Sequence, residues 1–372
     1  MVSITKSIGA TTAIEGGISE AIEDLPDFSR LLTEGSPVAV LGAGSWGTAL
    51  AALFAANGHN VRLWARDTAL IERLIADREN RQYLPGAMLS ESIDPTNDLD
   101  AAIRGAGVVV FAVPCGAIRE VATASAPHVE HDALIISAAK GLEETTGLRM
   151  SQLLAEIIPG VTPRIVALSG PNLAVEIARG APTASVAASE NPSAALAAQR
   201  LFLRSPNPTF RVYTGTDLVG VELGGAVKNA IAIGSGILEG LGHGDNSRAA
   251  LMTRGLAEAV RLGKAQGARI ETFLGLAGVG DLIATGGSRL SRNHRVGVAL
   301  GNGRSLEDIL QELGQVAEGV PTTRVLCALG ESCGVELPLC AALHAVLFEG
   351  KPVSDTIRDL MQRPPRDEYI NQ

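Results

Sequence analysis

The stretch PVAVLGAGSWGTAL at residues 37–50 decides the fold of this chain. It begins with a short apolar run typical of a buried strand and passes directly into GAGSWG, where Gly42, Gly44 and Gly47 have the GxGxxG spacing. Glycines at these positions allow a tight turn, a close approach of the backbone to a pyrophosphate and close packing of the following helix. The order of strand, glycine turn and helix therefore predicts a dinucleotide-binding site at the helix N-terminus.

Strand-like runs alternate with helical stretches after this motif, which is the pattern of parallel βαβ units. The runs are continuously hydrophobic, so we expect helices on both faces of the sheet. The sequence thus predicts an α/β, Rossmann-like N-terminal domain. Its expected strands lie at 37–41, 60–64, 108–113, 133–137 and 164–169.

The strand pattern stops after Asp217, and apolar residues then recur at spacings of three and four through 249–265 and 323–348. Such spacing is typical of helices, so the second part of the chain is expected to be an all-helical domain. The expected segments are a flexible N-terminal leader over 1–35, the Rossmann-like domain over 36–216, the helical domain over 217–356 and a C-terminal tail over 357–372.

Composition and charge exclude several classes of function. The 372 residues carry a net charge of -9, whereas a nucleic-acid backbone calls for a basic surface, so we expect no nucleic-acid partner. No uncharged apolar run approaches the length of a membrane span, and the first 35 residues lack the pattern of a secretory signal. The four cysteines form no CxxC pair or metal-ligand cluster, so we expect no metal and reduced thiols in a cytoplasmic protein.

The residues after the second predicted strand bear on the choice of cofactor. An acidic residue at this place accepts hydrogen bonds from the ribose 2'-hydroxyl of NAD, whereas an arginine suits the 2'-phosphate of NADP. The chain has Arg66 followed by Asp67, so Arg66 favours NADP(H) while Asp67 leaves NAD(H) open. A solvated loop charge is the alternative interpretation of Arg66.

Three further strand ends carry small or polar residues. They are VPC with Pro114 and Cys115, AAKG with Lys140, and SGPN at 169–172. Ligands in open α/β sheets bind outside the carboxyl ends of the strands, so we expect these loops to open onto one crevice. The direction of its strand aims Lys140 at the nicotinamide half of the cofactor.

The segment GGAVKNAIAIGSG at 224–236 places Lys228 among small and branched apolar residues. Burying an ammonium is costly, so a function or a carboxylate partner is expected, and snorkelling along a helix to solvent is the alternative. In a site low in water, an ammonium can stabilise a developing oxyanion and then donate a proton to it.

The helical part also contains NSRAALMTRGL at 246–256, GLAGVGDL at 275–282, SRN at 291–293 and EG at 318–319. With GAGSWG, VPC, KG, SGPN and GGAVKNAIAIGSG, these motifs follow the order of the bacterial NAD(P)-dependent glycerol-3-phosphate dehydrogenases. The chain resembles that family from about Ser36 to Gly350. The resemblance implies a Rossmann-like domain followed by an all-helical domain related to the hydroxyacid dehydrogenases, usually in a homodimer.

The resemblance also implies the roles of individual residues. Lys228 is expected to be the catalytic proton donor and acceptor, with Asp281 and Asn229 well suited to orient it. The implied substrate ligands are Lys140, Gly170, Asn172, Lys228, Asp281, Ser291, Arg292 and Asn293. The implied cofactor contacts are Gly42, Gly44, Ser45, Trp46, Gly47, Arg66, Lys140, Ala174, Arg292, Val316 and Glu318.

The implied reaction is the reversible conversion of dihydroxyacetone phosphate into sn-glycerol 3-phosphate with NADP(H) or NAD(H), which supplies phospholipid synthesis. The SRN segment suits a substrate phosphate, with a cap on a surface helix as its alternative interpretation. Two other hypotheses are a related hydroxyacid dehydrogenase and a non-catalytic nucleotide-binding sensor. A sensor would have no need of Lys228, Lys140 and Asp281 together.

Some positions depart from the family pattern or stand outside it. Gly286 stands where many members have cysteine, and His294 stands where arginine is common; neither carries an implied catalytic role. His243 lies in a glycine-rich loop but is not expected to be catalytic. For Glu222 and Glu239, a role near the site and a solvated helix charge are equally open interpretations.

Overall fold

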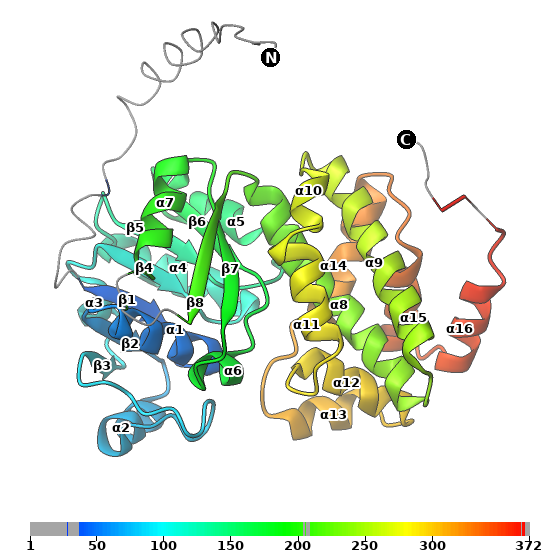
Figure 1. The fold of residues 1–372 in the computed structure, drawn as a ribbon, viewed down its shortest axis with the longest axis horizontal. Helices are drawn as coiled ribbons and strands as arrows, with labels where there is room; N and C mark the ends of the chain where they lie inside the picture. Colours follow the sequence, from blue (N-terminus) through cyan, green and yellow to red (C-terminus); the bar gives the residue numbers. More distant parts are fainter. Residues whose placement is uncertain (1–27, 29–36, 204, 206–208, 366, 369–372) are drawn as a thin grey trace, which may run out of the picture.

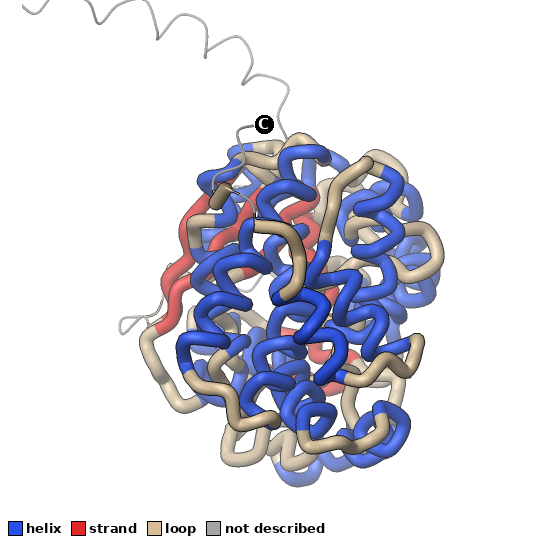
Figure 2. The backbone as a smooth tube through the Cα atoms, turned by 90° about the vertical axis from the view of Figure 1, so that its right-hand side faces the viewer, coloured by secondary structure: helices blue, strands red, loops and turns tan. Residues whose placement is uncertain are grey.

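The computed structural model describes residue 28 and residues 37–203, 205, 209–365, 367 and 368. Figure 1 shows two lobes, one containing the sheet and one made of helices, and Figure 2 views the molecule with the helical lobe in front of the strands. The eight strands are β1 Val38–Leu41, β2 Val61–Trp64, β3 Ile93–Thr96, β4 Val108–Phe111, β5 Leu134–Ser137, β6 Ile165–Ser169, β7 Thr183–Ala188 and β8 Phe210–Gly215.

These strands form one sheet in the order β3-β2-β1-β4-β5-β6-β7-β8, and every pair is parallel except β6 with β7. Successive residues of a strand point to opposite faces. In β1, Val38 and Val40 belong to one buried core while Ala39 and Leu41 belong to another. Both faces of the sheet are therefore covered, as the continuous hydrophobicity predicts.

The helices of the first lobe contribute to these two cores. Leu50 and Phe54 belong to one core, and Ile118 and Leu153 to the other. The α-helices of this lobe are α1 Ser45–Ala56, α2 Thr68–Asp77, α3 Leu99–Ile103, α4 Cys115–Ser125, α5 Met150–Ile157, α6 Ala174–Ala178 and α7 Pro192–Arg200, with short 3-10 turns η2 Ala126–His128 and η3 Thr162–Arg164.

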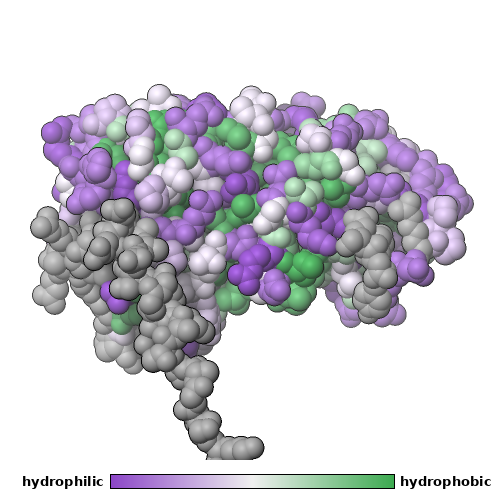
Figure 3. Space-filling model, turned by 90° about the horizontal axis from the view of Figure 1, so that it is seen from above, coloured by the Kyte–Doolittle hydropathy of each residue, from purple (hydrophilic) through white to green (hydrophobic). Residues whose placement is uncertain are grey.

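The second lobe is helical, as predicted. Its elements are α8 Leu218–Gly240, α9 Asp245–Ala265, α10 Ile270–Phe273, the π-helix η4 Leu276–Gly280, α11 Asp281–Gly286, α12 Arg292–Gly301, α13 Leu306–Leu313, α14 Gly319–Ser332, α15 Pro338–Phe348 and α16 Val353–Met361. Figure 3 shows hydrophilic residues spread over the upper face of both lobes, with apolar residues between them.

The five expected strands are confirmed, but the sheet has three more. β3 contains a proline at the sheet edge, β7 is rich in alanine, and β8 alternates buried and exposed residues as an edge strand does. None of the three is a continuous run of large apolar residues. The search for such runs therefore missed them.

Helix α8 is the centre of the helical lobe. Every residue from Leu223 to Ile233 is buried. Among the described residues, α8 is one helix long and apolar enough to cross a membrane, but 94% of its apolar window is buried inside the fold, as in a core helix. Its glycines allow close packing: a Cβ at Gly236 would lie 2.1 Å from the carbonyl oxygen of His294 on α12.

The expected leader lies outside the described residues except for Phe28, whose side chain is buried in the core of the first lobe. The expected boundary at 216/217 falls directly before α8. The expected start of the tail at 357 falls inside α16, which continues to Met361. The division of the chain into domains stays our prediction.

Candidate active site

The glycine turn after β1 has the geometry that the GxGxxG spacing predicts. Gly42 has a φ of +120°, and a Cβ there would lie 2.8 Å from backbone atoms of Ala112. A Cβ at Gly47 would lie 1.8 Å from the Gly42 oxygen, so only glycine lets α1 pack against the turn. At Gly44 a Cβ would meet nothing within 4 Å, so the space beside the turn is open.

The N-terminus of α1 is suited to an anion. No side chain caps it, and its first turn contains no acidic residue. The first amides are therefore available, and the helix dipole favours negative charge at this end. Together with the open space beside Gly44, these amides fit the pyrophosphate of NAD(P). When bound in its reduced form, this cofactor supplies a hydride to a ketone.

Two further residues of the turn are held by the first lobe. The Ser45 hydroxyl donates to the carbonyl oxygen of Tyr83 at 2.6 Å, so its side chain is already engaged. Trp46 packs against Phe210 with 6.3 Å between ring centroids. Its indole N–H is buried and has no hydrogen-bond partner within the described part of the chain.

The two charged residues after β2 have different surroundings. Asp67 accepts a hydrogen bond from the Leu70 amide at 3.2 Å and caps α2. Arg66 instead pairs with Glu120 of α4 at 2.8 Å, and the two side chains are 72% and 67% exposed. Asp67 thus stabilises the fold, and Arg66 is the exposed charge at this strand end.

The loops after β4, β5 and β6 meet, as expected. The sulfur of Cys115 would lie 2.7 Å from a Cβ at Gly141, and the Lys140 ammonium donates to the carbonyl oxygen of Gly170 at 2.7 Å. Gly170 has a φ of +132°, and a Cβ there would lie 3.0 Å from the Cα of Ser185. Its backbone conformation and its close packing both favour glycine.

Lys228 is buried in α8 with a carboxylate partner. The side chain of Lys228 is 9% exposed, and its Nζ lies 3.1 Å from Asp281 Oδ1 and donates to Thr285 Oγ1 at 2.8 Å. Burial lowers the pKa of Lys228 to about 8, the charge of Asp281 opposes this shift, and the charge of Lys140 adds to it. The ammonium therefore does not snorkel to solvent.

Asp281 joins the two lobes through its carboxylate. Its Oδ2 accepts from Lys140 Nζ at 2.7 Å, while Oδ1 faces Lys228 and also accepts from Thr285 at 2.9 Å. Burial acts to raise the pKa of Asp281, but the two lysine charges outweigh it and hold the pKa below its usual value. A single carboxylate thus pairs with two ammonium groups. We call Lys140, Lys228 and Asp281 the lysine–aspartate cluster.

Thr285 contacts both Lys228 and Asp281, and it is not among the residues predicted from the sequence. It lies four residues after Asp281 on α11, a spacing that places both side chains on one helix face. That spacing is the signal that could have found it. The chain enters α11 through η4, where a Cβ at Gly224 of α8 would lie 2.7 Å from the carbonyl oxygen of Ala277, so glycine lets the two elements approach.

Within the described part of the chain, Asn229 forms no hydrogen bond with the Lys228 ammonium, so the structure gives no direct support to its expected part in orienting that group. Its Nδ2 donates to the carbonyl oxygen of Lys140 at 2.9 Å. Its Oδ1 accepts from Asn293 Nδ2 at 2.8 Å, and Asn293 Oδ1 accepts from the Gly319 amide at 2.9 Å. The asparagine pair therefore connects α8, α12, α14 and the loop after β5.

The SRN segment begins α12. Ser291 accepts a hydrogen bond from the His294 amide at 3.2 Å and so caps α12, which leaves its O–H free to donate. Arg292 is exposed, and its charge is close enough to lower the pKa of Lys228. Val316 is exposed, while Glu318 accepts from the Cys115 amide at 2.9 Å across the lobes.

Asn172 and Ala174 follow β6. The Asn172 side-chain oxygen accepts a hydrogen bond from the Ser185 hydroxyl, while its buried NH2 group has no partner within the described residues. Ala174 begins α6 and packs against the core of the first lobe. Asn172 therefore retains a donor at the carboxyl edge of the sheet.

The open interpretation as a solvated charge is wrong for Glu222, while Glu239 is partly exposed. Glu222 is buried and pairs with Arg149 at 2.5 Å, and Glu239 accepts contacts from Arg248 at 3.2 Å and from His294 at 3.0 Å. Local sequence could not show this, because each partner is distant in the chain or lies on another element. His243 is exposed in the loop after α8.

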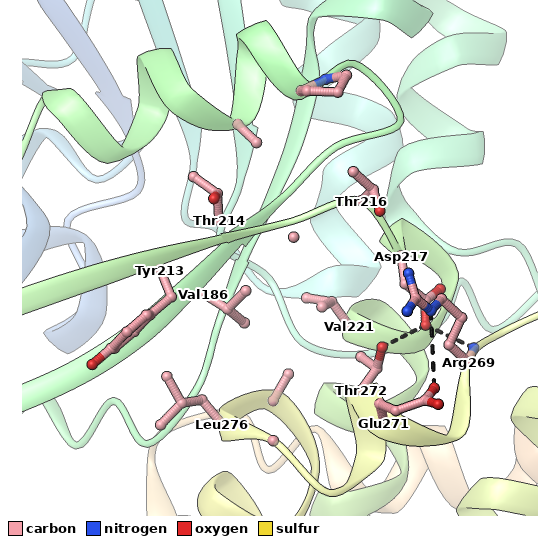
Figure 4. A pocket seen from close by; sticks show the side chains of 15 residues that line it. Val186, Tyr213, Thr214, Thr216, Asp217, Val221, Arg269, Glu271, Thr272 and Leu276 are labelled. Atoms are coloured by element: carbon pink, nitrogen blue, oxygen red, sulfur yellow. Dashed lines mark hydrogen bonds and ion pairs between the residues drawn. The ribbon is translucent and has the colours of Figure 1, made fainter. Parts of the chain in front are cut away.

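A cavity of about 490 Å³ lies at the junction of the lobes beside β8 and α10, and the lysine–aspartate cluster does not line it (Figure 4). Asp217 lines it but is fully engaged: it accepts from the amides of Gly220 and Arg269, each at 2.8 Å, and from the Thr272 hydroxyl at 2.6 Å. These bonds cap α8 and attach α10, so this carboxylate supports the fold.

Comparison with known proteins identifies a family whose two domain models match the two lobes. Residues 37–195 match the family model described as NAD-dependent glycerol-3-phosphate dehydrogenase N-terminus, and residues 217–358 match the model described as the C-terminus of the same enzyme. The chain belongs to the NAD-dependent glycerol-3-phosphate dehydrogenase family.

Relatives in this family match nearly their whole length. The glycerol-3-phosphate dehydrogenase (NAD(P)+) of Moorella thermoacetica is 49% identical over 88% of this chain and 96% of its own. The enzyme of the same name from Carboxydothermus hydrogenoformans is 47% identical over 89% and 98%. The crystal structure of glycerol-3-phosphate dehydrogenase from Coxiella burnetii has a TM-score of 0.83 at 37% identity, over 88% of this chain and 99% of that one.

Membership of the glycerol-3-phosphate dehydrogenase family confirms the predicted resemblance, the Rossmann-like and helical fold, the class of oxidoreductase and the use of NAD(P). All four cysteines are free. Gly286, where the family pattern often has cysteine, is closely packed: a Cβ there would lie 2.5 Å from Met252 Cε.

Proposed function

We propose that this protein reduces dihydroxyacetone phosphate to sn-glycerol 3-phosphate with NADPH or NADH and also catalyses the reverse reaction, supplying phospholipid synthesis. The observation that carries the proposal is the buried ammonium of Lys228 beside Asp281, which itself bridges to Lys140 at the carboxyl edge of the sheet. Nucleotide binding alone would require none of these three charges.

Lys228 is proposed to act on the ketone oxygen. As the carbonyl carbon is reduced, its oxygen acquires negative charge, which the ammonium stabilises and then neutralises by donating a proton. In the reverse direction, neutral Lys228 accepts the hydroxyl proton, and a pKa of about 8 makes both forms accessible near neutral pH. Asp281 and Thr285 orient the amine, since both contact it directly.

The substrate phosphate is assigned to the start of α12. Arg292 offers a planar fork of donors, and Ser291 keeps its O–H available while its oxygen caps the helix. The further proposed substrate ligands are Lys140, Gly170, Asn172, Lys228, Asp281 and Asn293. The proposed cofactor contacts are Gly42, Gly44, Ser45, Trp46, Gly47, Arg66, Lys140, Ala174, Arg292, Val316 and Glu318.

The test is to mix the purified protein with NADPH and to follow cofactor absorbance as dihydroxyacetone phosphate is added. Rapid oxidation with this substrate, and little with unphosphorylated dihydroxyacetone or a 2-ketoacid, is the expected result. Faster oxidation with the ketoacid would instead favour a related hydroxyacid dehydrogenase. Cofactor binding without oxidation of NADPH by any of these ketones would favour a nucleotide sensor.

The family resemblance also supports a homodimer located in the cytoplasm, and the net charge of -9 agrees with the absence of a nucleic-acid partner. Light scattering of the purified full-length chain would test the dimer. A monomer at all concentrations would contradict it.

A further inference from the structure

Glu222 lies on α8 six residues before Lys228, and its carboxylate leaves the helical lobe to contact the first lobe. Its Oε1 accepts from the Ser151 amide at 2.7 Å, and its Oε2 accepts from the Ser151 hydroxyl at 2.6 Å and from Arg149 at 2.5 Å. Ser151 is in the first turn of α5. A carboxylate from one lobe thus caps a helix of the other, where the helix dipole favours negative charge.

The backbone of α8 lies directly against the first lobe between Glu222 and Lys228. A Cβ at Gly225 would lie 2.9 Å from the Ser169 hydroxyl oxygen and 3.5 Å from Lys140 Cγ. Immediately after Lys228, Asn229 donates to the backbone of Lys140. The catalytic segment of α8 is therefore attached to the first lobe on both sides of the ammonium.

We propose that Glu222 is a positioning residue for the reaction: its contact with the N-terminus of α5 sets where α8 lies on the first lobe, and so where Lys228 lies relative to the cofactor. This inference rests on the proposed function. Glu222 touches neither Lys228 nor Asp281 through any hydrogen bond or ion pair found in the structure, so it acts through the placement of the helix.

The chain contains a matched control in Glu258. This glutamate of α9 is also buried and also accepts from the first-turn amides of a distant helix, those of Leu339 at 2.6 Å and Cys340 at 3.2 Å on α15. Both of its helices belong to the helical lobe. Glu258 therefore accepts helix N-terminal amides as Glu222 does, but it has no ion pair like that of Glu222 with Arg149 among the described residues, and it does not connect the lobes.

The experiment compares Glu222→Gln with Glu258→Gln in the full-length protein, measuring kcat, the KM for NADPH and the thermal midpoint. Gln keeps the size of the side chain but turns a donor toward Arg149 or Ser151, which weakens the contact. We expect Glu222→Gln to lower kcat about 10- to 100-fold, because small errors in placing a reacting group are costly. The KM for NADPH should change little.

Glu258→Gln should lower the thermal midpoint while kcat stays at the wild-type value. If Glu222→Gln does not fold, Ser151→Ala serves in its place, because it removes one hydrogen bond from the same carboxylate and keeps Arg149. Its kcat should fall in the same direction, by a smaller factor.

The outcomes separate the two proposals. Wild-type protein that does not oxidise NADPH with dihydroxyacetone phosphate refutes the proposed function and this inference with it. Wild-type turnover with a Glu222→Gln kcat equal to wild type, or with an equal loss in Glu258→Gln, refutes the inference alone.

Discussion

Two groups of paired charges lie on either side of the glycine turn after β1, the lysine–aspartate cluster and the Arg66–Glu120 pair, and they differ in burial. On the side of β5 and β6, Asp281 is 2% exposed and bridges two lysines from different lobes. On the side of β2, Arg66 and Glu120 are largely exposed to solvent. The lysine–aspartate cluster is thus largely enclosed by protein, whereas the Arg66–Glu120 pair faces solvent.

This difference decides what each pair can do. Exposed ion pairs are screened by water and salt and contribute little to stability, so their partners can be displaced by a ligand at low cost. A buried pair is held by the protein around it, and removing one member leaves the other without compensation. We therefore expect large effects at the lysine–aspartate cluster and small, ligand-selective effects at Arg66.

The largest effect is expected from Lys228→Ala. Without the Lys228 ammonium, the proposed proton donor to the developing oxyanion is lost, and kcat should fall roughly 100- to 10,000-fold, the usual contribution of general acid–base catalysis. Binding of NADPH, followed by fluorescence titration, should stay close to wild type because Lys228 is not among the proposed cofactor contacts. Turnover that persists in this variant would remove Lys228 from its catalytic role.

Asp281→Asn should lower stability as well as activity. The amide leaves the ammonium groups of Lys228 and Lys140 without their shared counter-charge, and the free energy of unfolding should fall by about 3 kcal/mol, as it does when buried pairs are broken. Urea denaturation followed by circular dichroism measures this change. Thr285→Val is the control, since it removes a hydrogen bond of the same cluster but no charge, and should cost about 1 kcal/mol. Equal losses in the two variants would contradict the importance of the charge.

The pH dependence follows from the lowered pKa of Lys228. Reduction of the ketone requires the ammonium, so kcat/KM for the ketone should decrease as the pH rises through about 8, while kcat/KM for oxidation of glycerol 3-phosphate should increase over the same range. Asp281 raises the pKa of Lys228, so Asp281→Asn should move both transitions to lower pH. Initial rates at substrate concentrations well below KM measure this. A reduction rate that is flat across this range would show that Lys228 does not supply the proton.

How much the sequence could predict depends on whether the partners of a residue lie near it in the chain. Gly42 and Gly47 could be predicted because local spacing fixes their contacts, and Lys228 because a buried charge within an apolar helix requires a reason. The partners Glu222 and Arg149 are 73 residues apart, and no local pattern relates them. Thr285 was within reach through its four-residue spacing from Asp281, but threonine is also an ordinary helix residue.

The smallest effects are expected at the exposed pair, and they should depend on the cofactor. Arg66→Ala should weaken NADPH binding about 10-fold, the scale of a hydrogen bond to a charged group, and affect NADH little. In the proposed site, Glu120 would compete with a 2'-phosphate for the Arg66 guanidinium, so Glu120→Gln should strengthen NADPH binding by about two- to fivefold, most clearly at low salt. Fluorescence titration with each cofactor measures both variants.

Glu312→Gln, which breaks the exposed pair with Arg304 on the helical lobe, is the control and should change neither affinity. If Arg66→Ala and Glu120→Gln alter NADPH and NADH binding equally, then Arg66 does not recognise the 2'-phosphate, and its pair with Glu120 is only a solvated surface contact.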